Sequence, residues 1–200
     1  MRPALLLAGG LVGLGAWAYF RQEESPARSG YAENDGGLLQ SLNDAAASVS
    51  ETLGDIVKFN SGWSESKIPP EYLAAIRTAE RANGIPHNIL ARLLYQESRW
   101  RPEIVSGAMK SSAGAIGIAQ FLPATAKEYG VNPYNAFESI AGAGRYLARL
   151  YKSFGNWTEA LAAYNWGQGN VRRKGLSNAP LETRNYYGQI LADVGGGVIV

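Results

Sequence analysis

The stretch Leu93–Trp100 reads Leu-Leu-Tyr-Gln-Glu-Ser-Arg-Trp and sets a carboxylate in the middle of an apolar helical stripe. Apolar residues recur upstream at helical spacing, at Ile89, Leu90, Leu93 and Leu94. At about 100° per residue, Glu97 falls on the same face of the helix as these residues. Burying an ionised carboxylate without a partner is costly, so we expect Glu97 to have a raised pKa and to stay protonated near neutral pH.

Pro102 predicts that this helix ends close to Glu97, because proline cannot continue a helix. The negative end of the helix dipole then also favours the protonated carboxyl. A protonated carboxyl at the edge of a core is what a general acid needs, for example in the cleavage of a glycosidic bond. The alternative is a structural glutamate paired with a nearby arginine, and the candidates are Arg92, Arg99 and Arg101.

The composition limits the class of domain and the kinds of active site that this chain can form. The 200 residues suit one domain with extensions, and an apolar fraction of 46% is ample for a core. The absence of cysteine excludes disulfides and thiolate chemistry, and a single histidine, His87, argues against a histidine triad or a multi-histidine metal site. The sequence therefore predicts no cofactor and no metal.

Charge is distributed unevenly along the chain. Residues 1–68 carry five Lys/Arg against eight Asp/Glu, whereas residues 69–200 carry fourteen against nine. A basic C-terminal part favours a polyanionic partner, and a wall glycan with peptide carboxylates fits as well as a nucleic acid. Because no phosphate loop, recognition helix or basic-aromatic ladder is present, we predict no nucleic-acid binding.

The N-terminal segment predicts contact with a membrane. Residues 3–20 are uncharged, lie between Arg2 and Arg21, and are just long enough to span a bilayer. A signal peptide cleaved after Ala16–Ala18 is the alternative. We favour a membrane anchor over residues 1–21, because aromatic residues stand at its end, at Trp17, Tyr19 and Phe20.

Residues 22–68 read as a linker that contains a short amphipathic helix at about 38–57. Whether this helix packs on the following domain, on a partner or on a membrane is left open. From residue 69 the pattern becomes mainly α, with helices expected from Pro70 to Asn83, through Glu97, around 140–151, after the cap Asn156, and over about 181–194. We expect a flexible loop after Pro102 and no strand of any length.

Three stretches together carry a resemblance to a known family. They are Glu97-Ser98, Ser111–Ala126 (Ser-Ser-Ala-Gly-Ala-Ile-Gly-Ile-Ala-Gln-Phe-Leu-Pro-Ala-Thr-Ala) and Ala162–Gly167 (Ala-Ala-Tyr-Asn-Trp-Gly). A weaker match is Glu182-Thr183-x-x-Tyr186-Tyr187. In this order and spacing they resemble the lytic transglycosylases, which share the lysozyme-like fold with goose-type lysozymes. The resemblance covers about residues 69–190.

The resemblance implies a mainly α, lysozyme-like catalytic domain at residues 69–200, with Glu97 as the catalytic acid. It implies cleavage of the bond between N-acetylmuramic acid and N-acetylglucosamine in peptidoglycan glycan strands. Glu97 protonates the bridging oxygen and then acts as base, while the C6 hydroxyl of the sugar attacks and leaves a 1,6-anhydro end. The implied substrate-binding residues are Ser98, Ser111, Gln120, Tyr164, Asn165, Glu182 and Tyr187.

Several of these residues also have simpler interpretations. Gly114 and Gly117 suit either an ordinary tight turn or the close approach of a glycan to the backbone. Asn165 equally suits a capping or packing role. The chain departs from the family pattern at Ala119, where methionine is usual, and at Trp166, which replaces a small residue. A long loop over residues 104–110 is a third departure, and all three bear on the shape of the subsites.

Two other functions stay open at this stage. A lysozyme-type hydrolase would use the same acid with a water nucleophile and a second carboxylate, but no second carboxylate stands in a motif opposite Glu97. Glu103 is near in sequence but follows Pro102. A wall-binding structural protein on a disused enzyme fold is the second possibility. The setting is either a periplasmic, membrane-anchored enzyme with envelope assembly partners or a bacteriophage virion component.

Overall fold

Helix α3 (Ile89–Ser98) is buried on almost every side in a helical domain. The structure is a computed structural model, and it is described for residues 62–195. The other α-helices in this range are α2 (Pro70–Ala82), α4 (Pro102–Val105), α5 (Pro123–Glu128), α6 (Ala136–Phe154), α7 (Trp157–Trp166), α8 (Gln168–Lys174) and α9 (Leu181–Asp193). Two short 3₁₀ helices, η2 (Glu65–Lys67) and η3 (Leu176–Asn178), complete the elements.

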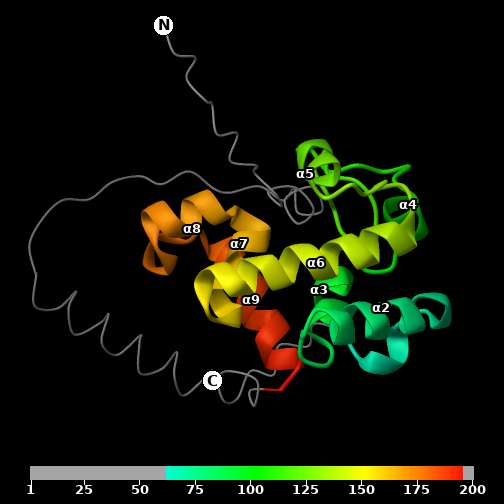
Figure 1. The fold of residues 1–200 in the computed structure, drawn as a ribbon, viewed down its shortest axis with the longest axis horizontal. Helices are drawn as coiled ribbons and strands as arrows, with labels where there is room; N and C mark the ends of the chain where they lie inside the picture. The colour runs from blue at the N-terminus through cyan, green and yellow to red at the C-terminus, as the bar shows by residue number, and fades with distance from the viewer. Residues whose placement is uncertain (1–61, 196–200) are drawn as a thin grey trace, which may run out of the picture. The chain divides into compact units, whose positions relative to one another are not determined.

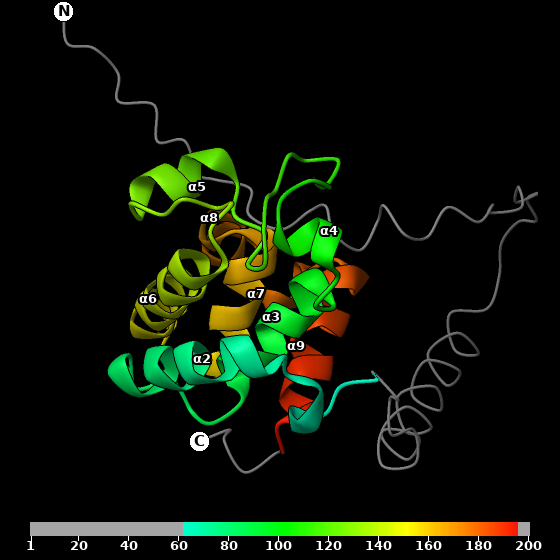
Figure 2. The same cartoon turned by 90° about the vertical axis from the view of Figure 1, so that its right-hand side faces the viewer.

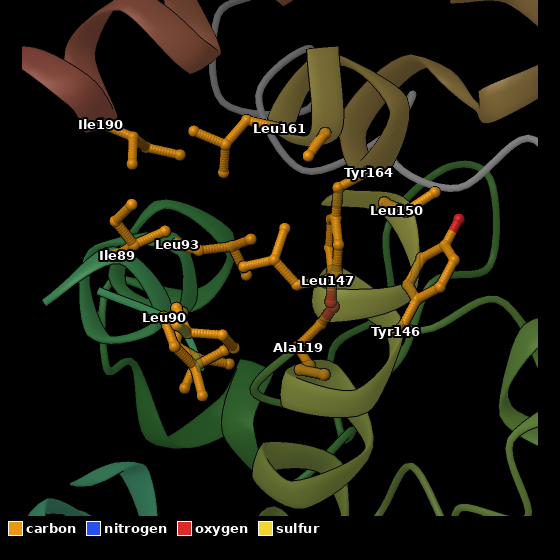
Figure 3. Close-up of a cluster of buried hydrophobic side chains, with 14 of the residues drawn as sticks. Ile89, Leu90, Leu93, Ala119, Tyr146, Leu147, Leu150, Leu161, Tyr164 and Ile190 are labelled. Atoms are coloured by element: carbon orange, nitrogen blue, oxygen red, sulfur yellow. The ribbon is translucent and has the colours of Figure 1, made fainter. Parts of the chain in front are cut away.

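The helices pack around α3 and α7. α3 contacts α2, α6 and α9, while α7 packs against α6, α8 and α9 (Figures 1 and 2). Figure 3 shows apolar side chains from α3, α6, α7, α9 and the loop before α5 meeting in one cluster, and its labelled members are Ile89, Leu90, Leu93, Ala119, Tyr146, Leu147, Leu150, Leu161, Tyr164 and Ile190. All of these residues are buried. Since α3 lies inside this core, its polar residues are buried with it.

The helices expected from residue 69 onward are confirmed, and their ends follow from local chemistry. The side chain of Asn156 accepts a hydrogen bond from the Glu159 amide at 2.8 Å and starts α7, as predicted. Asn135 caps α6 in the same way, and Gly155 ends that helix with a φ of 81°. α9 begins at Leu181 and ends at Asp193, one residue short of the predicted end.

Three short helices were not expected from the sequence: α4, α5 and α8. The expectation of a flexible loop after Pro102 was wrong, because Pro102 starts α4. Ile104 and Val105 are only 5% and 8% exposed, so burial of these two side chains holds the turn in place. Such short segments carry too few residues for a periodic pattern.

Residues before the predicted domain boundary at residue 69 already pack on the domain. Ile68 is 5% exposed, and Arg77 of α2 forms an ion pair with Glu65 at 2.6 Å. The predicted anchor at residues 3–20 and the predicted amphipathic helix at 38–57 lie outside the described residues. No helix between residues 62 and 195 is long and apolar enough to cross a membrane.

The loop between α4 and α5 carries the only β pairing in the described range, an antiparallel bridge between Ile116 and Phe121. Gly117 sits in the turn of this bridge with a φ of 79°. A Cβ atom at this position would overlap the carbonyl oxygen of Pro133. Gly117 is therefore required both for its backbone conformation and for the close contact with the segment before α6.

We predict that Gly117→Ala lowers the free energy of unfolding far more than Gly114→Ala does. Both glycines have a positive φ, 79° and 78°, so both variants pay about 1–2 kcal/mol for a left-handed alanine. Only Gly117 meets backbone, whereas Gly114 has no atom within 4 Å of the added Cβ, so we expect a further loss of about 1–3 kcal/mol at Gly117. Denaturant unfolding of the two variants measures the difference, and equal losses would contradict the close contact.

Candidate active site

Glu97 lies in the last turn of α3, where the chain reverses sharply. Arg99 and Trp100 follow with φ values of 51° and 57°, an uncommon conformation for residues other than glycine. The Ser98 hydroxyl stabilises this end of the helix, because it donates to the Leu94 carbonyl at 2.9 Å and accepts from the Trp100 amide at 3.2 Å. The reversal leaves Glu97 inside the core.

Glu97 is 4% exposed, and within residues 62–195 its carboxyl has one hydrogen bond, which Oε1 accepts from the Tyr186 hydroxyl of α9 at 2.5 Å. Burial raises its pKa to about 8; the bond from Tyr186 opposes this shift, and the charge of Glu182 adds to it. The carboxyl therefore holds its proton at neutral pH. This is the protonated, core-facing glutamate that the sequence predicted.

No arginine in residues 62–195 forms an ion pair with Glu97. Arg92 turns instead to Asp193 at 2.6 Å, and Arg101 pairs with Glu103 at 2.8 Å. The alternative of a structural glutamate neutralised by an arginine is therefore not what the described structure contains. Without such a counter-charge, protonation is the way in which this buried carboxyl stays stable.

Two aromatic hydroxyls approach Glu97 from different helices. Tyr186 is 5% exposed and Tyr164 of α7 is fully buried, and burial raises the pKa of each hydroxyl well above its ordinary value. The Tyr164 hydroxyl donates to the Ala119 carbonyl at 3.0 Å, which ties α7 to the loop that precedes α5 (Figure 3). Both tyrosines thus stay neutral and act as hydrogen-bond donors beside the acid.

The loop residues Ser111 and Gln120 shape a turn. The Ser111 hydroxyl accepts from the Ala115 amide at 2.9 Å, and the Gln120 amide group donates to the Gly117 carbonyl at 3.0 Å. Gln120 is 3% exposed and has a φ of 47°. Within the described residues its carboxamide oxygen accepts no hydrogen bond, so this acceptor is available to a substrate donor.

Asn165 is a buried residue of α7 that forms a hydrogen bond with α9. It is 4% exposed, and its side-chain oxygen accepts a hydrogen bond from the Thr183 hydroxyl at 2.8 Å. This bond joins α7 to α9, one turn before Tyr186. Asn165 therefore links two helices beside the site, whereas its contact with a substrate stays a prediction.

Three further predicted site residues are Glu182, Tyr187 and Ser98, and of these only Glu182 is shown to act on the carboxyl of Glu97. Glu182 is half-buried and close enough to raise the pKa of Glu97, and its own pKa is raised by burial. Tyr187 is half-buried, and it is its neighbour Tyr186 that donates the hydrogen bond to Glu97. Ser98 is fully buried and holds the helix end, so its contact with a substrate, like that of Tyr187, stays a prediction.

Tyr186 is the site residue that the sequence analysis missed. The core residues Ile190 and Leu191 admit either tyrosine at helical spacing, so the periodicity of α9 does not choose between Tyr186 and Tyr187. The choice depends on how α9 is rotated against α3, which is a tertiary property. Between residues 62 and 195, no three His, Asp or Glu side chains gather.

Comparison with known proteins identifies the family. The model of the transglycosylase SLT domain matches residues 74–187, which contain α3, the loop, α7 and most of α9. The chain belongs to the SLT transglycosylase family. The resemblance seen in the sequence motifs is thereby confirmed.

Relatives of the SLT domain include both bacterial and phage proteins. Membrane-bound lytic murein transglycosylase F of Stutzerimonas stutzeri is 32% identical over 143 residues, which are 68% of this chain and 28% of that protein. Peptidoglycan transglycosylase gp16 of Escherichia phage T7 is 31% identical over 116 residues, 54% of this chain and 8% of that protein. The chain thus spans about a quarter or less of the length of these curated relatives.

Solved structures support the same fold for the SLT domain. The 70-kDa soluble lytic transglycosylase in complex with bulgecin A superposes with a TM-score of 0.54 at 28% identity, covering 64% of this chain and 24% of that one. SLT70 from Escherichia coli gives a TM-score of 0.51, also at 28% identity and with the same coverage. The mainly α, lysozyme-like architecture predicted for the catalytic domain agrees with these matches.

We predict that Glu97→Gln stabilises the SLT domain by an amount that grows with pH. The pKa of Glu97 is about 8 in the folded protein, against an ordinary value of 4.5 in the unfolded chain, so the wild type loses stability as pH rises from 4.5 to about 8. Glutamine keeps the shape and cannot ionise. The advantage of the variant should be absent below pH 4.5, reach a few kcal/mol, and level off above pH 8. Denaturant unfolding across this range measures it, and parallel stability curves for the two proteins would contradict the raised pKa.

Proposed function

We propose that this protein is a peptidoglycan lytic transglycosylase in which Glu97 is the general acid. The observation that carries the proposal is a carboxyl that is 4% exposed, protonated at neutral pH and held by a single tyrosine hydroxyl. General-acid catalysis works best when the pKa of the donor lies near the working pH. Membership of the SLT family and the names of the relatives support peptidoglycan as the substrate.

The proposed reaction balances with one carboxyl. Glu97 gives its proton to the glycosidic oxygen as the bond from C1 of N-acetylmuramic acid breaks, and N-acetylglucosamine leaves as an alcohol. The resulting carboxylate takes the proton of the C6 hydroxyl of N-acetylmuramic acid while O6 bonds to C1. The product is a 1,6-anhydro sugar, no water is consumed, and Glu97 is protonated again.

The surrounding residues have distinct proposed tasks. Tyr186 orients the Glu97 carboxyl and favours its ionised form, which stabilises the carboxylate between the two proton transfers. The carboxamide oxygen of Gln120 and the hydroxyl of Ser111 lie in the loop that we propose to contact the glycan. Burial is the main reason why Glu97 keeps its proton, and the charge of Glu182 adds to the cost of ionising it.

A lysozyme-type hydrolase is the second candidate, and Glu182 is the observation that favours it. Glu182 is a carboxyl in electrostatic contact with Glu97, which the sequence analysis did not foresee as a second catalytic carboxylate. In a hydrolase it would activate water or act as nucleophile. Burial raises the pKa of Glu182, which weakens it in either task and favours the transglycosylase reaction.

For location we propose a membrane-anchored enzyme of the cell envelope, with a phage virion protein as the alternative. The uncharged segment at residues 3–20 and the membrane-bound relatives support the first setting. The phage T7 relative supports the second. Partners in envelope or virion assembly belong to the same proposal.

We predict that Glu97→Gln reduces the release of muropeptides from purified peptidoglycan at least about a thousandfold, because glutamine cannot donate the proton. Mass spectrometry of the wild-type products should find ends lighter by one water than hydrolysis products. The matched control is Glu103→Gln, which removes a partly exposed carboxylate paired with Arg101 and should leave the rate unchanged.

The outcomes separate the candidates. Reducing ends from the wild type, together with an inactive Glu182→Gln variant, would replace the transglycosylase by a hydrolase. Turnover by Glu97→Gln at the wild-type rate would reject both enzymatic proposals.

A further inference from the structure

Arg92 is a fully buried arginine in the same helix as the catalytic acid, five residues before Glu97. Its Nε donates to the Asp193 carboxylate at 2.6 Å, and its Nη1 donates to the Gln96 side-chain oxygen at 2.7 Å. Its Nη2 is buried without a hydrogen-bond partner in the described structure. A permanently charged group in this position depends on its ion pair, because removal of the partner leaves an uncompensated buried charge.

Asp193 belongs to α9, the helix that also carries Tyr186. The side chain of Asp193 is 18% exposed, so the ion pair is largely shielded from solvent. Tyr186 stands seven residues earlier, which is two helical turns or roughly 10 Å along the axis. α3 and α9 are thus joined at two points, at Arg92–Asp193 and at Glu97–Tyr186.

The two contacts occur in opposite order along the two helices, which are therefore antiparallel. Arg92 precedes Glu97 in α3, whereas Asp193 follows Tyr186 in α9. Two contacts fix both the rotation of α9 and its position along α3. A shift of α9 by one residue would move Tyr186 by about 1.5 Å along the axis and by about 100° around it, which breaks its bond to Glu97. The rotation that separates Tyr186 from Tyr187 at the site is therefore held at the far end of the helix.

Charged and titratable groups of the described residues surround these two contacts. Glu97 faces Tyr186 and Glu182 of α9 and Tyr164 of α7. Arg92 faces Asp193 and Tyr186 of α9, and the charge of Arg99, the residue that follows α3, also acts on it. Among these, the Arg92–Asp193 pair is the one ionic link between α3 and α9 in the described range.

We propose that Arg92 and Asp193 are positioning residues for the catalytic acid: their ion pair sets α9 on α3 so that the Tyr186 hydroxyl reaches the Glu97 carboxyl. This inference rests on the proposed role of Glu97. It gives a task in the reaction to two residues that do not touch the reacting atoms.

The test is the titration of the Glu97 carboxyl by ¹³C NMR in the full chain, with Glu97→Gln used to assign the signal. We compare the wild type with Asp193→Asn, Tyr186→Phe and the double variant. If the ion pair acts through Tyr186, Asp193→Asn shifts the midpoint of the Glu97 titration by about half a pH unit or more. In the Tyr186→Phe background, the same substitution then causes no further shift.

The matched control is Glu128→Gln, which breaks an ion pair with Arg149 whose side chains are more than half exposed. It removes the same kind of charge and should leave the Glu97 midpoint where it is. Should Asp193→Asn not fold, Asp193→Glu gives a graded test, because it keeps the charge and displaces it by one methylene; an intermediate shift is then expected.

An unchanged Glu97 midpoint in Asp193→Asn or Asp193→Glu, with only a lower melting temperature, would overturn the proposal, because the pair would then serve stability alone. Equal shifts with and without Tyr186→Phe would overturn it too. Peptidoglycan cleavage by the wild type is measured alongside. Its absence would reject the proposed function, while the titration still decides whether the pair positions Tyr186.

Discussion

The constraint on which this domain depends is the desolvation of one carboxyl, that of Glu97. α3 is enclosed by α2, α6 and α9, and a glutamate in its last turn cannot reach water without leaving the core. Desolvation is the largest influence on its pKa and outweighs the hydrogen bond from Tyr186 that favours ionisation. The outcome is a carboxyl that is protonated near neutral pH and is still able to give its proton away.

Segments far apart in the sequence assemble the surroundings of this acid. α9 contributes Tyr186, and α7 contributes Tyr164, whose hydroxyl bond to Ala119 holds the glycine-containing loop. The bond between Asn165 and Thr183 connects α7 to α9. Each interaction is buried, so each is expected to be strongly coupled to the packing around it. The site is thus a property of helix packing more than of any single loop.

Much of this arrangement could be predicted from the sequence, because local chemistry determines it. Helical spacing placed Glu97 on a buried face, and the Asn156 cap located the start of α7. The short helix α4 was missed since four residues have no period, and Tyr186 was passed over since helical spacing admits Tyr187 as well. Arg92 and Asp193 are 101 residues apart in the sequence, and Asp193 is the last residue of its helix. No local sequence pattern therefore predicts that they pair. Both features depend on how α9 is rotated against α3, which the sequence pattern does not specify.

The pH dependence of kcat/KM for peptidoglycan cleavage tests the central claim most directly, because this quantity reports the ionisation of groups in the free enzyme. With Glu97 as the proton donor, kcat/KM falls as pH rises, and the midpoint of the alkaline limb lies near the Glu97 pKa of about 8. A fall centred near 4.5, the ordinary value for glutamate, would show that the acid is ionised in the working enzyme and would contradict the account.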